Sequence, residues 1–135
     1  MSENPTLESA LHLLGPLEGR IMRAVWAGTL RQPFVVRDVQ KVTPELAYTT
    51  LMTTLSRLAE KGILSQDRVP HQRAYEYRSA GTPEQFLSAV SREQVSRMVE
   101  RFGEAALAAF AAELEDLTPA QRERLQRLAA GAAGE

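Results

Sequence analysis

The sequence predicts a mainly α-helical chain that contains one short β-hairpin and divides into two parts. Apolar residues recur at helical spacing over residues 15–62 and again over residues 82–130. Between these stretches, over residues 63–80, the apolar period changes to two, which is typical of paired strands. The two helical stretches differ enough in charge and in residue size to indicate separate parts.

Charge is divided unevenly between the two parts. From Leu11 to Ala80 there are ten Lys and Arg residues against six Asp and Glu, a net charge of +4. From Gly81 to Glu135 there are six against nine, a net charge of −3. A basic first part within a chain of net charge −1 favours a polyanionic partner for that part.

The composition excludes several classes of site. The chain of 135 residues contains no cysteine, which excludes disulfides, thiolate catalysis and zinc-finger sites. With only His12 and His71, and without a glycine-rich phosphate loop, the sequence predicts no metal, no cofactor and no enzyme activity. No apolar run reaches the roughly 18 residues that span a membrane, and the first twenty residues do not resemble a secretion signal, so we expect cytoplasmic localisation and no membrane contact.

The first part begins with a weakly patterned segment and a clear helix. We expect residues 1–14 to form a flexible N-terminus. Gly15-Pro16 then starts a helix, since proline suits the first helical position. Its apolar face comprises Leu17, Ile21, Ala24 and Val25. Trp26 ends this helix and is interpreted as a core anchor.

A turn and a short second helix follow. Residues 28–34 read as a turn, with Gly28 ending the preceding helix and Phe34-Val35 as a short extended piece. Residues 36–42 predict a helix that turns Val36, Val39 and Val42 inward. Pro44 then disfavours helical geometry in the residue before it.

The third helix, within residues 46–62 (LAYTTLMTTLSRLAEKG), has an unusual content of threonine. At about 100° per residue, one arc of the helix faces the core. The core arc comprises Leu51, Met52, Leu55, Leu58 and Ala59. The opposite arc comprises Thr49, Thr50, Thr53, Ser56 and Arg57, with Thr54 at its edge. The hydroxyl groups are thus gathered on the face away from the core.

A β-hairpin is predicted from residues 63–69 and 74–80, where Tyr75 and Tyr77 alternate with charged residues. Its tip carries Arg68, His71 and Arg73. Three helices followed by a hairpin form the winged helix-turn-helix arrangement. We therefore predict a winged helix DNA-binding domain at residues 15–80, with the third helix in the major groove and the hairpin as the wing.

The polar face of the third helix suits a DNA groove. A threonine offers a short side chain with a hydroxyl for phosphate or base edges and a methyl for thymine. Arg57 can reach a phosphate. For any single threonine, the alternative is a solvated hydroxyl that bonds back to its own helix.

The second part predicts three helices over residues 82–130. Thr82-Pro83-Glu84-Gln85 forms a capping box that starts a helix reaching Phe102, a second helix covers residues 104–116, and Thr118-Pro119-Ala120-Gln121 starts a third that ends near Ala130. Residues 131–135 are expected to be a disordered tail.

Three modest amphipathic helices bury little area by themselves, so we predict a helical dimerisation domain. Its interface residues would be Phe86, Val90, Met98, Phe102, Leu107, Phe110, Leu114 and Leu125. The alternative is that these helices fold back onto the first half of the same chain.

Several segments together resemble a known family. LGPLEGRIMRAVW, VVRDVQ, LAYTTLMTTLSRLAEKGIL and AYEYR are similar to the penicillinase/methicillin repressor family (BlaI/MecI type) of bacterial transcription factors. The resemblance covers residues 11–130. It implies a homodimeric repressor that binds a palindromic operator in double-stranded DNA and leaves it on an inducing signal such as β-lactam or cell-wall stress. The DNA-binding residues it implies are Thr49, Thr50, Thr53, Arg57 and Arg73.

The resemblance also raises the question of proteolytic release. In staphylococcal-type repressors, a sensor protease pathway leads to cleavage at an Asn-Phe bond shortly before an acidic segment. The matching pair here is Ala109-Phe110, which keeps Phe and lacks Asn, so we interpret Phe110 as dimer core. A copper-responsive branch of the family uses C-terminal cysteines, which this chain lacks.

Two alternatives remain open from the sequence alone. One is a winged-helix module that binds protein and has no operator. The other is a repressor released by a small ligand held between the two domains.

Overall fold

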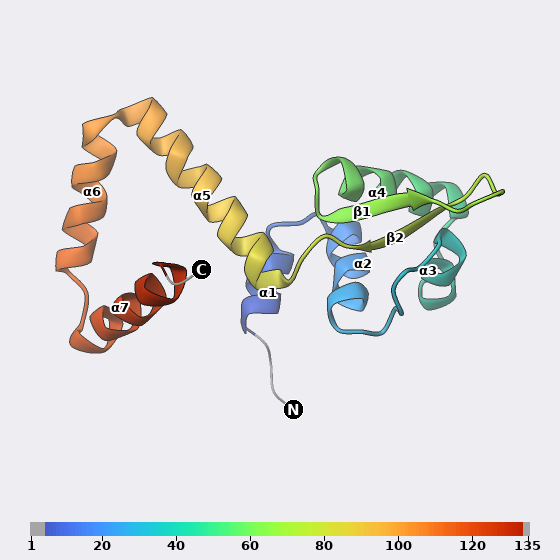
Figure 1. Cartoon of the computed structure of the whole chain (residues 1–135), viewed down its shortest axis with the longest axis horizontal. Coiled ribbons are helices and arrows are strands. Elements are labelled where there is room, and N and C mark those ends of the chain that lie inside the picture. Colours follow the sequence, from blue (N-terminus) through green and yellow to red (C-terminus); the bar gives the residue numbers. More distant parts are fainter. Residues whose placement is uncertain (1–4, 134–135) are drawn as a thin grey trace. The chain divides into compact units, whose positions relative to one another are not determined.

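The computed structural model describes residues 5–133 and divides the chain into two compact units, the first ending at Val90 and the second beginning at Ser91. Figure 1 shows the order of the elements. The elements are α1 (Pro5–His12), α2 (Pro16–Trp26), α3 (Val36–Val42), α4 (Tyr48–Glu60), β1 (Leu64–Arg68), β2 (Tyr75–Ser79), α5 (Pro83–Phe102), α6 (Glu104–Glu115) and α7 (Pro119–Ala133). The predicted class, mainly helical with a winged helix-turn-helix, is confirmed.

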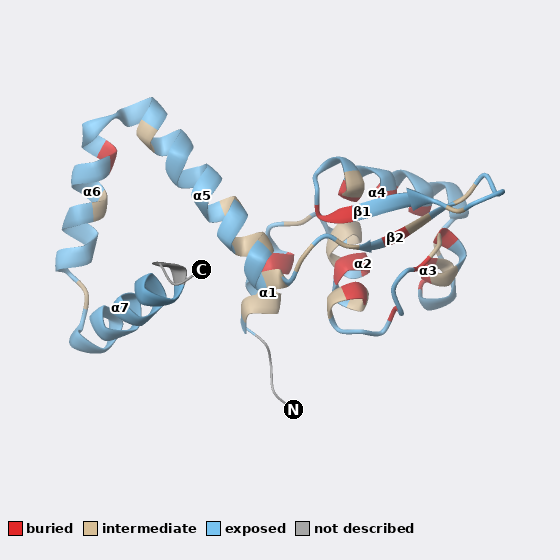
Figure 2. Ribbon diagram, viewed as in Figure 1, coloured by how far each residue is buried: buried red, intermediate tan, exposed pale blue. Residues whose placement is uncertain are grey.

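The core of the first unit lies between α2, α3, α4 and the hairpin (Figure 2). Its fully buried side chains come from all four elements and from the segment before α3. They include Ile21, Met22, Val25, Phe34, Val39, Leu51, Leu55, Leu58 and Leu64. Because each helix contributes a single apolar stripe, the opposite stripes of α3 and α4 stay free for a partner.

The N-terminal segment is more ordered than the sequence indicated. Our prediction of a flexible stretch over residues 1–14 is wrong for residues 5–12, which form α1; residues 1–4 lie outside the described part of the chain. Ala10 and Leu11 are buried, and α1 packs on α2. A helix of eight residues is marginal alone, so this order comes from tertiary packing, which sequence periodicity cannot detect.

The helix-turn-helix consists of α3, a five-residue connection and α4. Val36 and Val39 are buried as predicted, whereas Val42 is 39% exposed, so its predicted inward position is wrong. The chain turns inward at the next residue instead: Thr43 is buried, and its hydroxyl donates to the carbonyl of Val39 at 2.8 Å. The same carbonyl also accepts the backbone N–H of Thr43 at 3.0 Å, so the buried hydroxyl of Thr43 is satisfied within the last turn of α3.

The hairpin pairs β1 with β2 in antiparallel register, from Leu64 opposite Ser79 to Arg68 opposite Tyr75. Phe34 extends this small sheet, because its backbone exchanges hydrogen bonds of 2.9 and 2.7 Å with Tyr77. The predicted extended piece at Phe34 is therefore present as a single bridge. The Phe34 and Tyr77 rings stack, with centroids 6.0 Å apart, and hold the wing against the core.

The second unit comprises the rest of α5 together with α6 and α7. The predicted capping box at Thr118 is formed, with Gln121 N–H donating to Thr118 Oγ1 at 3.2 Å and Thr118 N–H to Gln121 Oε1 at 3.0 Å. The third helix continues to Ala133, so the expected disorder is wrong for residues 131–133; residues 134–135 lie outside the described chain. Within the described part of this unit, Ala106 alone is buried (Figure 2).

Candidate nucleic-acid interface

The outward face of α4 carries the predicted polar side chains. Leu51, Leu55 and Leu58 are fully buried. The side chains that the helical wheel placed outward are all exposed: Thr49, Thr50, Thr53, Ser56 and Arg57. Packing of one leucine stripe against the core thus determines which face of α4 can meet a groove.

Two residues of α4 differ from their predicted positions. Met52, assigned to the core arc, is 46% exposed, while Thr54, placed at the edge of the polar arc, is buried. The core contacts α4 on the side of Thr54 and not on that of Met52. Thr54 tolerates burial because its hydroxyl donates to the carbonyl of Thr50 at 2.8 Å.

Thr53 also bonds back to its own helix. Its hydroxyl donates to the carbonyl of Thr49 at 3.0 Å, as in the alternative raised for single threonines. The proton of that hydroxyl is thereby occupied, but its oxygen still has acceptor capacity. In this rotamer Thr53 offers outward an acceptor and a methyl group, which match amino groups and thymine methyls in the major groove better than phosphates.

Cations of the first unit fall into two groups. Three of them, all in or against α2, form ion pairs: Arg20 with Glu45, Arg23 with Glu8 at 2.6 Å, and Lys61 with Glu18 at 2.9 Å. Seven others form no ion pair within residues 5–133: Arg31, Arg37, Lys41, Arg57, Arg68, Arg73 and Arg78.

The seven cations without an ion pair belong to α3, α4, the hairpin and the loop before α3. The paired cations therefore stabilise the unit, while the remaining cations lie on the elements that a winged helix presents to DNA.

An aromatic group, which sequence reasoning did not assign to the site, lies where the wing meets α4. Burial of the Tyr77 side chain raises the pKa of Tyr77, and Ser56 lies close enough to its hydroxyl to oppose the rise. Tyr75 and Tyr48 lie close enough to raise that pKa further. Tyr75 and Tyr77 are two residues apart on one strand, so their side chains share a face. This spacing is the sequence signal that could have placed Tyr75 here.

The start of α5 belongs to the first unit. Phe86 packs on Trp26, with ring centroids 5.7 Å apart, and is partly buried against the core. Part of its surface is therefore covered within its own unit, and its place in a dimer interface stays a prediction. The capping box at Thr82 is formed as predicted, with bonds of 2.9 and 3.1 Å to Gln85.

The other predicted interface residues lie in α5, α6 and α7. Val90 and Phe110 are half-buried, and the remaining side chains are exposed: Met98, Phe102, Leu107, Leu114 and Leu125. Ala109 and Phe110 lie near the middle of the twelve-residue α6, where the backbone is helical. A protease that binds extended backbone would need this helix to open first.

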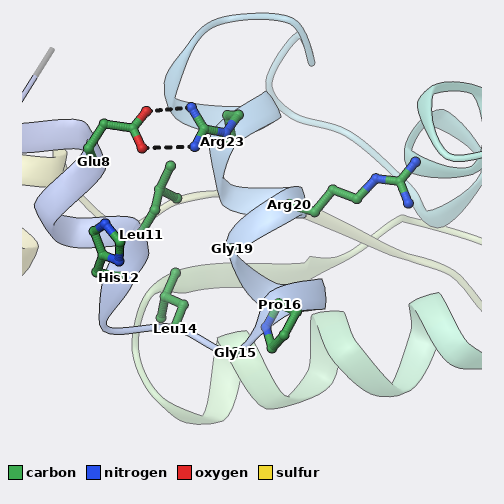
Figure 3. A pocket seen from close by; sticks show the side chains of 9 residues that line it. All are labelled: Glu8, Leu11, His12, Leu14, Gly15, Pro16, Gly19, Arg20 and Arg23. Carbon is green, nitrogen blue, oxygen red and sulfur yellow. Dashed lines mark hydrogen bonds and ion pairs between the residues drawn. The ribbon is translucent and has the colours of Figure 1, made fainter. Parts of the chain in front are cut away.

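A cavity of about 320 Å³ lies between α1 and α2 (Figure 3). Leu11, Leu14 and Gly19 line it, and the Arg23 guanidinium meets the Glu8 carboxylate at its edge through bonds of 2.6 and 3.0 Å. Arg20, which also lines it, is paired with Glu45. Both guanidinium groups are thus already occupied, and the cavity lies within the first unit, not between two domains.

Over residues 5–133, no group of three or more His, Asp or Glu side chains is placed to hold a metal ion. In the same residues, no helix combines the length and the apolar character that crossing a bilayer requires.

The chain is similar in sequence to known proteins. Residues 14–130 match the family model described as "Penicillinase repressor". The chain is 42% identical over 67 residues to the transcriptional regulator BlaI of Mycobacterium tuberculosis, strains CDC 1551 / Oshkosh and H37Rv. That segment is 47% of this chain and 46% of the relative, so the match spans about half the length of these curated relatives.

Similar solved structures are more distant. They include M. tuberculosis Rv0081 (21% identical, 74% of this chain and 97% of that chain, TM-score 0.43) and the transcriptional regulator PA4135 (22%, 85% of each chain, TM-score 0.45). A third is a point mutant of MepR from a multidrug-resistant S. aureus clinical isolate (15%, 92% of this chain and 87% of that chain, TM-score 0.46). The family model covers most of the chain, including the helix-turn-helix and the wing, and this protein belongs to the penicillinase repressor family of transcriptional regulators.

Proposed function

We propose that the protein is a homodimeric repressor that binds a palindromic operator with α4 in the major groove and the hairpin against the flanking backbone. Thr49, Thr50 and Thr53 would face base edges, while Arg57 and Arg73 would contact phosphates. Such a regulator would act on chromosomal DNA in the cytoplasm. The observation that carries this proposal is the coincidence of one exposed polar face on α4 with cations that have no carboxylate partner in the described chain.

Charge supports the proposal quantitatively. Residues 11–80 carry a net charge of +4, and two copies on one face of a dimer would carry about +8. Neutralising several phosphates releases their counterions, so binding should weaken steeply with salt. The acidic Glu60 at the end of α4 favours an approach in which the first half of the helix enters the groove, as in other helix-turn-helix proteins.

Exposed apolar side chains support the homodimer. Met98, Phe102 and Leu107 are 41%, 52% and 55% exposed, and Leu114, Leu125 and Leu128 add to them. A single unit leaves these groups in water, and a second copy is the simplest cover, because twofold dimers are the commonest oligomers. Phe102→Glu should weaken the dimer roughly a thousandfold, at about 2 kcal/mol per buried phenylalanine in each protomer. Analytical ultracentrifugation measures the dimer dissociation constant of Phe102→Glu, with Arg127→Glu as the control variant.

Release from the operator would follow an inducing signal, for which β-lactam or cell-wall stress is the proposal that family membership supports. Cleavage between Ala109 and Phe110 by a sensor protease is less favoured, since the Asn of the staphylococcal pair is absent and the bond lies within a helix. Release by a small ligand remains the alternative route.

The experiment that tests the proposal is binding of the purified protein to fragmented DNA from its own source at two salt concentrations. We expect a recurring palindrome that is bound more weakly at high salt. Arg57→Glu should abolish this binding, whereas Arg127→Glu, with the same change of charge on α7, should retain it. Binding of a protein partner that survives Arg57→Glu, without any recurrent DNA site, would favour the alternative of a protein-interaction module.

A further inference from the structure

Three large side chains remain exposed beside the polar face of α4. Tyr48 is 41% exposed, Met52 46% and Tyr75 41%. Tyr48 and Met52 are one helical turn apart, and Met52 lies next to Thr49 and Ser56 around the helix axis. Single exposed apolar residues are ordinary, but here the methionine continues the face that carries the threonines.

The surroundings of Tyr77 place this group at the base of the wing. Ser56, on the exposed side of α4, lies close enough to the Tyr77 hydroxyl to lower the pKa of Tyr77, and Tyr48 and Tyr75 lie close enough to raise it. Tyr75 also has the same side-chain direction as Tyr77, two residues along β2. Met52 therefore lies on the wing side of α4, between the threonine face and two exposed tyrosines.

The chemistry of Met52 limits what it can recognise in a groove. Its thioether is a weak acceptor and has no proton to donate, so it gains little from a phosphate or from a base carbonyl. The one apolar group that base pairs present in the major groove is the 5-methyl of thymine. An unbranched, polarizable side chain adapts its shape to such a group at modest cost.

We propose that Met52 is a specificity-determining residue that packs against a thymine 5-methyl group in each half of the operator. This inference rests on the proposed function and deepens it. DNA is favoured over a protein as the occupant because cations elsewhere on α3, α4 and the hairpin, such as Lys41, Arg57 and Arg73, have no ion-pair partner among residues 5–133. A protein-binding patch would require a strongly acidic partner to match them.

The test is a double-mutant cycle between Met52 and the thymine methyls of the recovered operator. Each thymine is replaced in turn by deoxyuridine, which removes only the 5-methyl group, and the Kd is measured for the wild-type protein and for Met52→Ala. For wild type we expect one symmetric thymine pair at which the affinity falls about fourfold for one half-site and about fifteenfold for both, as burial of one methyl predicts. For Met52→Ala the same replacement should have no further effect.

Met52→Leu serves as the matched variant, because it keeps an apolar side chain and should retain most of the sensitivity to the methyl group. Circular dichroism checks that both variants fold, which the exposure of Met52 leads us to expect. If removal of the methyl group lowered the affinity of wild type and of Met52→Ala equally at every thymine, the inference would be overturned while the repressor function stayed intact. Absence of any operator binding by wild type would instead reject the proposed function itself. If Met52→Ala bound DNA normally but lost a protein partner, the inference about Met52 would be overturned in favour of a protein-binding patch.

Discussion

The indole N–H of Trp26 donates to the carbonyl oxygen of Gly81, 3.0 Å away, and to Ser79 Oγ at 3.1 Å. The end of α2 is thereby joined to the segment that leads from the wing into α5. Phe86, one turn into α5, packs on the same indole. Trp26 thus anchors the start of α5 to the DNA-binding unit through the bifurcated hydrogen bond of its N–H and one aromatic contact.

Substitution at Trp26 should separate these two contacts. Trp26→Phe keeps a ring against Phe86 but removes the donor, which should lower the free energy of unfolding by about 1 kcal/mol. Trp26→Ala should lower it by about 3 kcal/mol, since the packing is lost as well. Urea unfolding followed by circular dichroism measures both, with Arg127→Ala as the surface control. Equal losses for the two variants would contradict the separate role of the N–H group.

The two capping boxes allow a matched comparison. Thr82→Ala and Thr118→Ala remove the same side-chain bond at the starts of α5 and α7, and each should destabilise its helix by about 1 kcal/mol. Thr82→Ala should also lower the unfolding midpoint of the first unit, because α5 begins against its core; Thr118→Ala should leave that midpoint unchanged. The fluorescence of Trp26 measures the unfolding of the first unit. As a control, Thr82→Ser should restore the wild-type unfolding midpoint, because serine keeps the capping hydroxyl.

The pair between Glu8 and Arg23 predicts a modest acid dependence of stability. The hydrogen bond from Arg23 lowers the pKa of Glu8 below its ordinary value of 4.5. A carboxyl whose pKa is lower in the folded state stabilises the protein above its unfolded pKa and loses that contribution as the pH falls through the folded value.

Glu8→Gln should therefore lower the Tm slightly at pH 7 and leave it unchanged relative to wild type near pH 2. The difference at pH 7 should shrink in 1 M salt, since the pair is exposed and screened. Thermal unfolding at both pH values and both salt concentrations measures this. A difference that persisted at pH 2 would show that Glu8 acts through packing and not through its charge.

Removal of Arg57 should change the salt dependence of operator binding by a defined amount. If Arg57→Ala removes one phosphate contact from each protomer, the logarithm of the operator association constant should fall less steeply with the logarithm of the salt concentration. The slope should change by about 1.8 for the dimer. Arg57→Lys should keep most of the slope, because a cation remains. An unchanged slope for Arg57→Ala would place Arg57 outside the phosphate contacts.

Much of the helical layout follows from local rules that operate within a few residues. The bounds of α3 and the start of α5 at Pro83 agree with the prediction because valine spacing and the Thr82 capping box act locally. The outward face of α4 was also predictable, since a leucine stripe determines which side of a helix is buried. That Thr49, Thr50, Thr53, Arg57 and Arg73 bind DNA stays a prediction.

Where the prediction failed, contacts between distant residues were responsible. The order of α1 depends on packing against α2, and the contact of Phe86 with Trp26 was not expected because the two residues lie far apart in the sequence. Met52 was assigned to the core because the wheel gives directions around one helix but not the direction from which the core meets it.

The sequence by itself determined that the segments of α2 to α7 are helical, where α5 and α7 are capped and which arc of α4 is polar, because these properties arise from neighbours along the chain. Only the tertiary structure decided which cations are neutralised by carboxylates and which remain free of ion pairs among residues 5–133. An ion pair between Lys61 and Glu18 depends on a distance through space between residues far apart in the sequence. The same packing determined that Met52 and Tyr75 lie exposed beside the threonines of α4.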